Sequence, residues 1–495
     1  MRYKWLQEIS MPIAFTAIRC SIAILTSLAG FAACAQTGSV PIGNDSAETQ
    51  TAWRASSRLG YAPTPSFAMT ADAAPMAWAL QQVEAAHAAS GQAPAIPPGL
   101  ARFNAPMADL ARDVLAERDA RKVLRAQAVA ADTAMVSPAA AMAGGPLFSR
   151  DMAQSASAWR LMACSDPALE HPLLARMTEF WFNHLNVSVS KGTVRPFVGH
   201  YVVNAIRANA LGRFEDLLLA SARHPAMLFY LDQSQSSNRG LNENYARELM
   251  ELHTLGVGGG YTQGDVHELA RILTGWTVNL PGGEGFRFAG RRHDTGSKRF
   301  MGQTYHSEGL KEGEDAIRFL ARQPATARRI AGRLATFFVA DQPPAALVER
   351  LAATFMATQG DIRAVMRTLV QSPEFWSADN RLFKTPMDFA CSALAVAGGV
   401  TDPQGIPQAL GFLAQAGQPL HGWQTPDGYK TDAATWLAPE ALTRRADFAM
   451  ALARRIPEPV YLKAYLGAAT LARVAREALP LRTGLMLASP DFMRK

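Results

Sequence analysis

The stretch NENYARELMELHTLG, Asn242 to Gly256, holds the residues of this chain that are best spaced to do chemistry. On a helix, Glu248 and Glu251 lie one turn apart, so their carboxylates repel each other unless a cation or a shared proton intervenes. Such a pair could bind a hard cation or act as a general acid and base. Ion pairing is the alternative, because Glu243, Arg247 and Glu251 also have the spacing of an ordinary salt-bridge ladder. We take Glu248 and Glu251 as candidate catalytic residues.

A second helix is predicted in TQGDVHELARILTGW, where Thr262 and Asp265 match a capping box. Its polar side carries His267 and Glu268. Helices joined by a short turn usually pack antiparallel, so these side chains could meet the two glutamates in one cleft. His267 is therefore a third catalytic candidate, with a solvated helix face as the alternative.

His184 is the fourth catalytic candidate. It follows three aromatic residues in EFWFNHL, where a helix would be largely buried, and a buried polar group needs a partner. His184 could serve as a general base, or it could make a structural hydrogen bond to a helix end. His253 falls on the apolar side of its helix and is expected to be a core residue.

Two loops carry candidate substrate-binding residues. RRHDTGSK presents His293, Asp294 and Lys298, which suit either ligand binding or turn structure. GQPLHGWQTPDGYKTDAATW presents aromatic rings that could stack on sugars or on a partner protein, or could pack back onto the core. These rings are Trp423, Tyr429 and Trp436.

The sequence contains no motif that assigns a cofactor. We find no phosphate loop, no Gly-x-Ser-x-Gly elbow, no His-Glu-x-x-His and no Cys-x-x-Cys spacing. Nucleotide and thiolate-metal sites are therefore not predicted, and the metal ligands are unknown. A divalent cation would suit the paired glutamates.

The elements that must position these residues are mostly helices. Amphipathic segments follow one another, divided by Pro- and Gly-rich turns, without the β-α alternation of a nucleotide-binding sheet. We predict a mainly α fold, one large multi-helix domain over residues 51–495. Alternating residues at 286–288 and 298–302 predict a small β-hairpin insertion, about residues 284–304, whose strands pair with each other.

The N-terminus resembles an export signal. A basic start precedes an apolar stretch, Ser21 to Ala33, that is too short to span a bilayer. We expect a signal peptide over residues 1–35, cleavage before Gln36, and a disordered leader over residues 36–50. A lipid anchor at Cys34 is the less favoured alternative. The mature chain would be periplasmic or secreted, with no transmembrane segment.

Charge and cysteine content set further bounds. The formal net charge of +7 is mild and its basic residues are scattered, which does not favour nucleic-acid binding but leaves some attraction to anionic polymers. After cleavage only Cys164 and Cys391 would remain. They could form one disulfide or stay as two buried thiols.

Several stretches together resemble the bacterial domain of unknown function 1800 family. They include RLGYAPTPS, FWFNHL, LNENYARELMELHTLGVGGGYTQGDVHELARILTGW, HDTGSK, LVQSPEFW and GQPLHGWQTPDG, and the resemblance runs from about Thr51 to Phe492. It implies an exported, mostly helical protein that is often encoded beside a sulfatase-like partner family. It assigns no role to any residue.

Two functions are consistent with these features. The first is a cell-envelope enzyme, for example a hydrolase of a polysaccharide or other envelope polymer, with Glu248 or Glu251 as acid or base and His184 or His267 assisting. The second is a non-catalytic scaffold that binds an exported sulfatase-like partner or a glycan through the aromatic loop.

Overall fold

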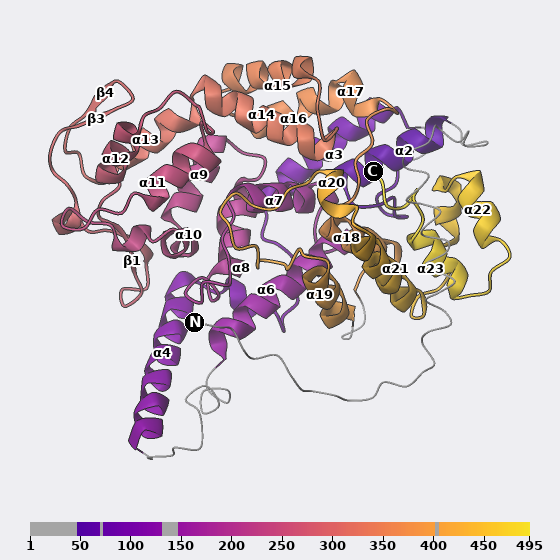
Figure 1. The fold of residues 1–495 in the computed structure, drawn as a ribbon, viewed down its shortest axis with the longest axis horizontal. Coiled ribbons are helices and arrows are strands. Elements are labelled where there is room, and N and C mark those ends of the chain that lie inside the picture. The colour runs from indigo at the N-terminus through magenta and orange to yellow at the C-terminus, as the bar shows by residue number, and fades with distance from the viewer. Residues whose placement is uncertain (1–46, 70–72, 131–146, 401–404) are drawn as a thin grey trace, which may run out of the picture.

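The chain folds mainly into α-helices, with two small antiparallel sheets (Figure 1). The structure is a computed structural model that describes residues 47–69, 73–130, 147–400 and 405–495. This confirms the predicted mainly α fold. The predicted signal peptide and Cys34 lie outside the described residues.

The larger of two hydrophobic clusters is built from helices in the first three quarters of the chain. These helices are α3 (Pro75–Ser90), α4 (Met107–Ala130), α6 (Phe148–Ser165), α7 (Pro172–His184), α8 (Val198–His200), α9 (Phe214–Arg223), α10 (Pro225–Tyr230), α11 (Asn244–Glu248), α12 (Gln263–Ile272), α13 (Leu310–Ala321), α14 (Pro324–Phe338), α15 (Ala345–Ala357), α16 (Ile362–Gln371) and α17 (Pro373–Trp376). Figure 1 shows α14, α15 and α16 stacked along one edge, while α4 projects from the body.

The smaller cluster joins the first described helix to the C-terminal part of the chain. Its helices are α2 (Ala47–Leu59), α18 (Pro386–Val396), α19 (Gly405–Gln415), α20 (Ala433–Trp436), α21 (Pro439–Ala453), α22 (Ala468–Val474) and α23 (Leu481–Leu487). Helix α2 begins at Ala47, so residues 47–50, predicted as part of a disordered leader, are helical instead.

Helix α6 connects the two clusters. Its Trp159 packs in the larger cluster, and its Leu161 and Cys164 pack in the smaller one. Cys164 is bonded to Cys391 in α18, with a Cα–Cα distance of 5.6 Å and 227 residues between them in the sequence. Of the two alternatives for these cysteines, the structure therefore has the disulfide, which fastens the smaller cluster to α6.

The helices begin where local chemistry satisfies their free N–H groups. Proline occupies the first turn of α7, α10, α14 and α18, where its missing N–H costs nothing. At α12 the predicted capping box is present, because the Thr262 side chain accepts from Asp265 N and the Asp265 side chain accepts from Thr262 N.

The strands are present, but the predicted pairing between them is wrong. Strand β2 (Gly285–Phe288) pairs with β1 (Trp276–Asn279), and β3 (Lys298–Phe300) pairs with β4 (Gln303–Tyr305). The insertion is therefore two hairpins rather than one. The sequence predicts Trp276 at the end of a helix, but Gly275 has a φ of +85°, a left-handed conformation that ends the helical region before β1.

In the part of the chain that the structure describes, no helix combines the length and apolar character needed to cross a membrane.

Candidate functional site

The stretch from Asn242 to Gly256 is not one regular helix. Helix α11 ends at Glu248, and residues Leu249–His253 form a π-helical turn (η5). Asn242 Oδ1 accepts from Asn244 N at 2.9 Å, and Gly256, which follows the π-helical turn, has a φ of +87°. Wide turns of this kind are rare and often occur at functional sites. A π-helical turn contains more residues than an α-helical turn, so the side chains after Glu248 do not share the faces that a regular α-helix would give them.

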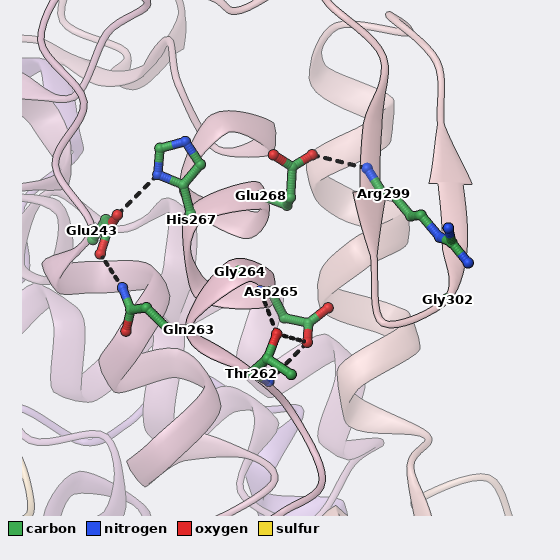
Figure 2. Close-up of a pocket in the computed structure, with 9 residues that line it drawn as sticks. All are labelled: Glu243, Thr262, Gln263, Gly264, Asp265, His267, Glu268, Arg299 and Gly302. Carbon is green, nitrogen blue, oxygen red and sulfur yellow. Dashed lines mark hydrogen bonds and ion pairs between the residues drawn. The ribbon is translucent and has the colours of Figure 1, made fainter.

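An open polar groove lies beside the N-terminal end of α12 (Figure 2). It has a volume of about 580 Å³. It is lined by Glu243, Thr262, Gln263, Gly264, Asp265, His267, Glu268, Arg299 and Gly302. Helix α12 supplies most of these residues, the start of α11 supplies Glu243, and the β3–β4 hairpin supplies Arg299 and Gly302.

His267 and Glu243 form a hydrogen-bonded dyad in this groove. His267 Nδ1 lies 3.0 Å from Glu243 Oε1, and Gln263 Nε2 donates to Glu243 Oε2 at 2.8 Å (Figure 2). The hydrogen bond from His267 is the main reason why the pKa of Glu243 lies below its ordinary value. A carboxylate can only accept, so this hydrogen bond requires a proton on Nδ1, and Nε2 is the nitrogen left to act as a base.

The other two carboxylates of the groove hold the fold together. Asp265 accepts from Thr262 N at 2.8 Å and from Met301 N at 2.6 Å. Glu268 lies 2.8 Å from Arg271 Nη1 and accepts from Arg299 N at 2.9 Å. Both acids therefore connect α12 to the β3–β4 hairpin, and His267 is the lining residue with a nitrogen free to take a proton.

Glu248 and Glu251 do not line this groove, so the possible cleft in which they meet His267 and Glu268 is not the one found here. Glu251 lies 3.5 Å from Arg247, which also lies 3.3 Å from Glu243, so the salt-bridge ladder is present. Partly exposed pairs within one helix contribute little to stability.

Glu248 is the more unusual of the two glutamates. It is half-buried, and no described residue makes a hydrogen bond or ion pair with its carboxylate. Burial, followed by the negative charge of Glu251, raises its pKa, and Asp427 on the C-terminal loop adds to the effect. A carboxyl that keeps its proton to higher pH has the property of a general acid.

The loop that carries Asp427 is fastened to the end of α7. Asn183 Nδ2 donates to Tyr429 O at 3.0 Å, and Tyr429 N donates to Asn183 Oδ1 at 2.8 Å. Gly428 permits this contact, because a Cβ there would stand 2.2 Å from Asn183 O. Asn183 therefore has the partner that a buried polar residue needs, and the partner is 246 residues away.

The three aromatic rings of this loop have different surroundings. Tyr429 is 8% exposed and Trp436 is 4% exposed, so substrate contact does not fit either ring. Trp436 Nε1 instead donates to Lys430 O at 2.8 Å. Trp423 is half-buried, with Nε1 donating to Thr425 Oγ1 at 3.0 Å, and is the ring that can still reach a partner.

His184 lies in the core rather than at a surface. It is 1% exposed, and its Nε2 lies 3.0 Å from His253 O at the end of the π-helical turn. Burial, with the nearby Arg333, holds the pKa of His184 well below its usual range. Direct proton transfer to a substrate does not fit this burial, and the structural hydrogen bond to a helix end does.

The HDTGSK loop is also largely internal. His293 Nε2 and Lys298 Nζ lie 2.5 and 2.7 Å from the same Glu312 oxygen, and all three side chains are buried. Asp294 lies 2.9 Å from Arg271. Substrate contact therefore does not fit His293 or Lys298, because both side chains are buried and paired with Glu312 of α13.

Sequence reasoning missed Glu312, Asp427 and the role of Glu243. Glu312 could have been found from the sequence, since it lies on the apolar stripe of α13 with Ala316 and Leu320. A glutamate in such a position must have a buried cationic partner. Asp427 and the Glu243–His267 contact left no local signal.

The described residues contain no group of three or more His, Cys, Asp or Glu side chains arranged to hold a metal ion.

The fold and the groove define a class of protein: a mainly helical body with a histidine–carboxylate dyad in an open polar groove. The chain belongs to the family described as protein of unknown function (DUF1800), whose model matches residues 54–494. No curated protein and no solved structure shows a significant match to it.

Proposed function

We propose that the chain is an exported enzyme that uses His267 as a general base to hydrolyse a hydroxyl-rich polymer of the cell envelope. The observation that carries this proposal is the His267–Glu243 dyad, with Nδ1 held at 3.0 Å by the carboxylate in an open groove. A neighbouring carboxylate fixes the tautomer and stabilises the imidazolium that forms when Nε2 takes a proton.

The reaction would follow directly from this geometry. His267 Nε2 takes the proton of a water that attacks an ester or glycosidic bond, and later returns it to the leaving oxygen. Apart from two glycines, the residues that line the groove are polar or charged, and none is a large apolar residue. Such groups form hydrogen bonds with sugar hydroxyls, which favours a glycan over an apolar substrate.

The disulfide supports export. Disulfides persist in oxidising compartments such as the periplasm and the extracellular space, and are rare where thiols are kept reduced. The Cys164–Cys391 bond therefore fits a periplasmic or secreted chain. Cell fractionation of the natural host tests this, and the protein in the cytosolic fraction would contradict it.

The catalytic proposal is tested with isolated envelope polysaccharides as substrates, by measuring the release of reducing ends and of acetate. We expect H267N to lose roughly 100-fold or more of the activity, the usual effect of removing a general base. H306N is the matched control, because His306 is exposed outside the groove. Equal activity of H267N and H306N would refute the role of His267.

E248Q belongs in the same assay. The raised pKa of Glu248 makes this residue the competing candidate for a catalytic acid. Loss of activity in E248Q, with H267N still active, would move the reaction centre to Glu248 and Asp427.

A binding role is the second candidate, and the half-buried Trp423 favours it. This ring stands on a loop held in place by Asn186, whose Nδ2 donates to Trp423 O and Thr425 O at 3.1 and 2.8 Å. A rigid, partly exposed tryptophan suits recognition of a glycan or of an exported sulfatase-like partner. W423A would then abolish capture of that ligand without lowering the melting temperature.

A further inference from the structure

A second surface gathers arginines from three separate segments. Arg239, Arg287 and Arg291 are exposed, and within the described ranges their guanidinium groups make no hydrogen bond or ion pair. We call these three residues the arginine face. They do not line the groove of His267, and their chemistry is independent of the reaction proposed there.

Main-chain hydrogen bonds bring Arg239 beside Arg291. Ser237 and Gly240 bond to each other and close a tight turn with Arg239 near its tip. Asn238 N in this turn donates to Arg292 O at 2.8 Å, and Asn238 Nδ2 donates to His293 O at 3.2 Å. The turn therefore lies directly against the segment that carries Arg291.

The β1–β2 sheet adds Arg287 to the same surface. Arg287 pairs with Thr277, so both side chains point to the same face of the sheet. Thr277 Oγ1 donates to Ser234 O at 2.8 Å, which places the segment before the tight turn on that face.

Arg292 links the backbone segments that carry the arginine face. Its Nη1 donates to Thr277 Oγ1 at 3.3 Å, and its Nη2 donates to Ser234 O at 3.1 Å and to Ser236 O at 3.2 Å. One half-buried guanidinium thus connects the Arg291 segment to the segment before the tight turn and to β1, the strand that pairs with the strand of Arg287. Fixing the backbone segments that carry the arginines before a ligand arrives reduces the entropy lost on binding.

Two of the three acids on these segments are already paired with cations outside the arginine face. Asp294 is paired with Arg271 at 2.9 Å, and Asp232 is paired with Lys191 at 2.6 Å. Glu284, in the β1–β2 turn, is the remaining acid of these segments. Three arginines therefore share these segments with one unpaired acid, and oxyanions that accept two hydrogen bonds from a guanidinium relieve the remaining repulsion.

We propose that the arginine face binds an anionic polysaccharide, one that carries carboxylate or sulfate groups along its chain. A membrane surface is less suitable, because none of the exposed large hydrophobic residues lies on these segments to enter the lipid. A nucleic acid is less suitable too, because Phe286 and Phe288 pack against Trp276 and His293 and offer no ring for base stacking.

The test is binding of fluorescent oligogalacturonate, followed by anisotropy at several salt concentrations. We expect the triple variant R239A/R287A/R291A to bind roughly tenfold or more weakly, because three exposed charge contacts are lost. Its affinity should also depend less steeply on salt.

The matched control is R125A/R328A/R444A, which removes the same charge from exposed arginines that also have no partner among the described residues. This control should bind as the unmodified chain does, and both triple variants should keep its melting temperature. Equal weakening in the two triple variants would overturn the proposal by showing an effect of net charge alone. Absence of binding by the unmodified chain, or tighter binding to anionic vesicles or single-stranded DNA, would overturn it as well.

Discussion

At the scale of single residues, the groove depends on a contact between two side chains that are 24 positions apart. Glu243 stands at the start of α11 and His267 stands in α12, and packing of α11 against α12 brings them together. Neither residue is unusual by itself. The dyad becomes a candidate base because Glu243 binds one imidazole nitrogen and leaves the other one without a partner among the described residues.

The dyad makes a prediction that needs no substrate. Since the hydrogen bond from His267 is the main cause that lowers the pKa of Glu243, H267A should raise that pKa toward the ordinary glutamate value. The measurement is a carbon-13 NMR titration of the glutamate side-chain carboxyls. H306A is the control and should leave Glu243 unaffected. An unchanged titration of Glu243 in H267A would show that the contact is absent in solution.

At the scale of elements, the two hairpins and α13 depend on buried charges. Lys298 of β3 lies 2.7 Å from Glu312 of α13, and both side chains are almost completely buried. A charge left unpaired in such a place is far more costly than one at a surface. The loop that resembled a ligand site in the sequence is therefore a connection between a strand and a helix.

E312Q should therefore destabilise the protein strongly. Removing the carboxylate leaves Lys298 buried without a counter-charge, and breaking a buried pair in this way costs about 3–5 kcal/mol. The matched control is E308Q, which breaks the exposed Lys311–Glu308 pair and should cost about 1 kcal/mol or less. Chemical denaturation of both variants measures the difference. Equally small losses would mean that Glu312 does not neutralise Lys298.

At the scale of the whole molecule, burial keeps several histidines neutral. Burial lowers the pKa of His171 and of His200 to about 4, and that of His253 to about 3. These residues belong to the helical body rather than to the groove. In the unfolded chain each would titrate near about 6.5.

Stability should consequently fall as the pH falls from about 6.5 to 4. In this window the unfolded chain takes up protons at these histidines while the native chain does not. Each histidine therefore lowers the free energy of unfolding by up to about 1.4 kcal/mol per pH unit. Above the window all of them are neutral in both states and the stabilisation is complete. H171Q should reduce the slope of unfolding free energy against pH by about one proton.

The measurement is denaturant unfolding at a series of pH values between neutral and mildly acidic conditions. H306Q is the control, because His306 is exposed and its removal should leave the slope unchanged. If H171Q and the unmodified chain lose stability equally fast on acidification, His171 is not held neutral by the fold.

The sequence by itself determined the properties that depend on neighbours along the chain. Apolar residues at helical spacing determined the mainly α class, and the Thr262–Asp265 pattern determined where α12 begins. The salt-bridge ladder through Arg247 also follows from spacing alone. These features involve residues within one or two helical turns, so the local pattern contains the necessary information.

Only the tertiary structure decided which distant residues meet. The tertiary structure determines which strands pair and that Cys164 bonds to Cys391. It also places Glu248 outside the groove and brings the three segments of the arginine face together. The physical reason is that side-chain type and spacing define what a residue can bind, whereas helix packing and chain reversal define what lies within its reach.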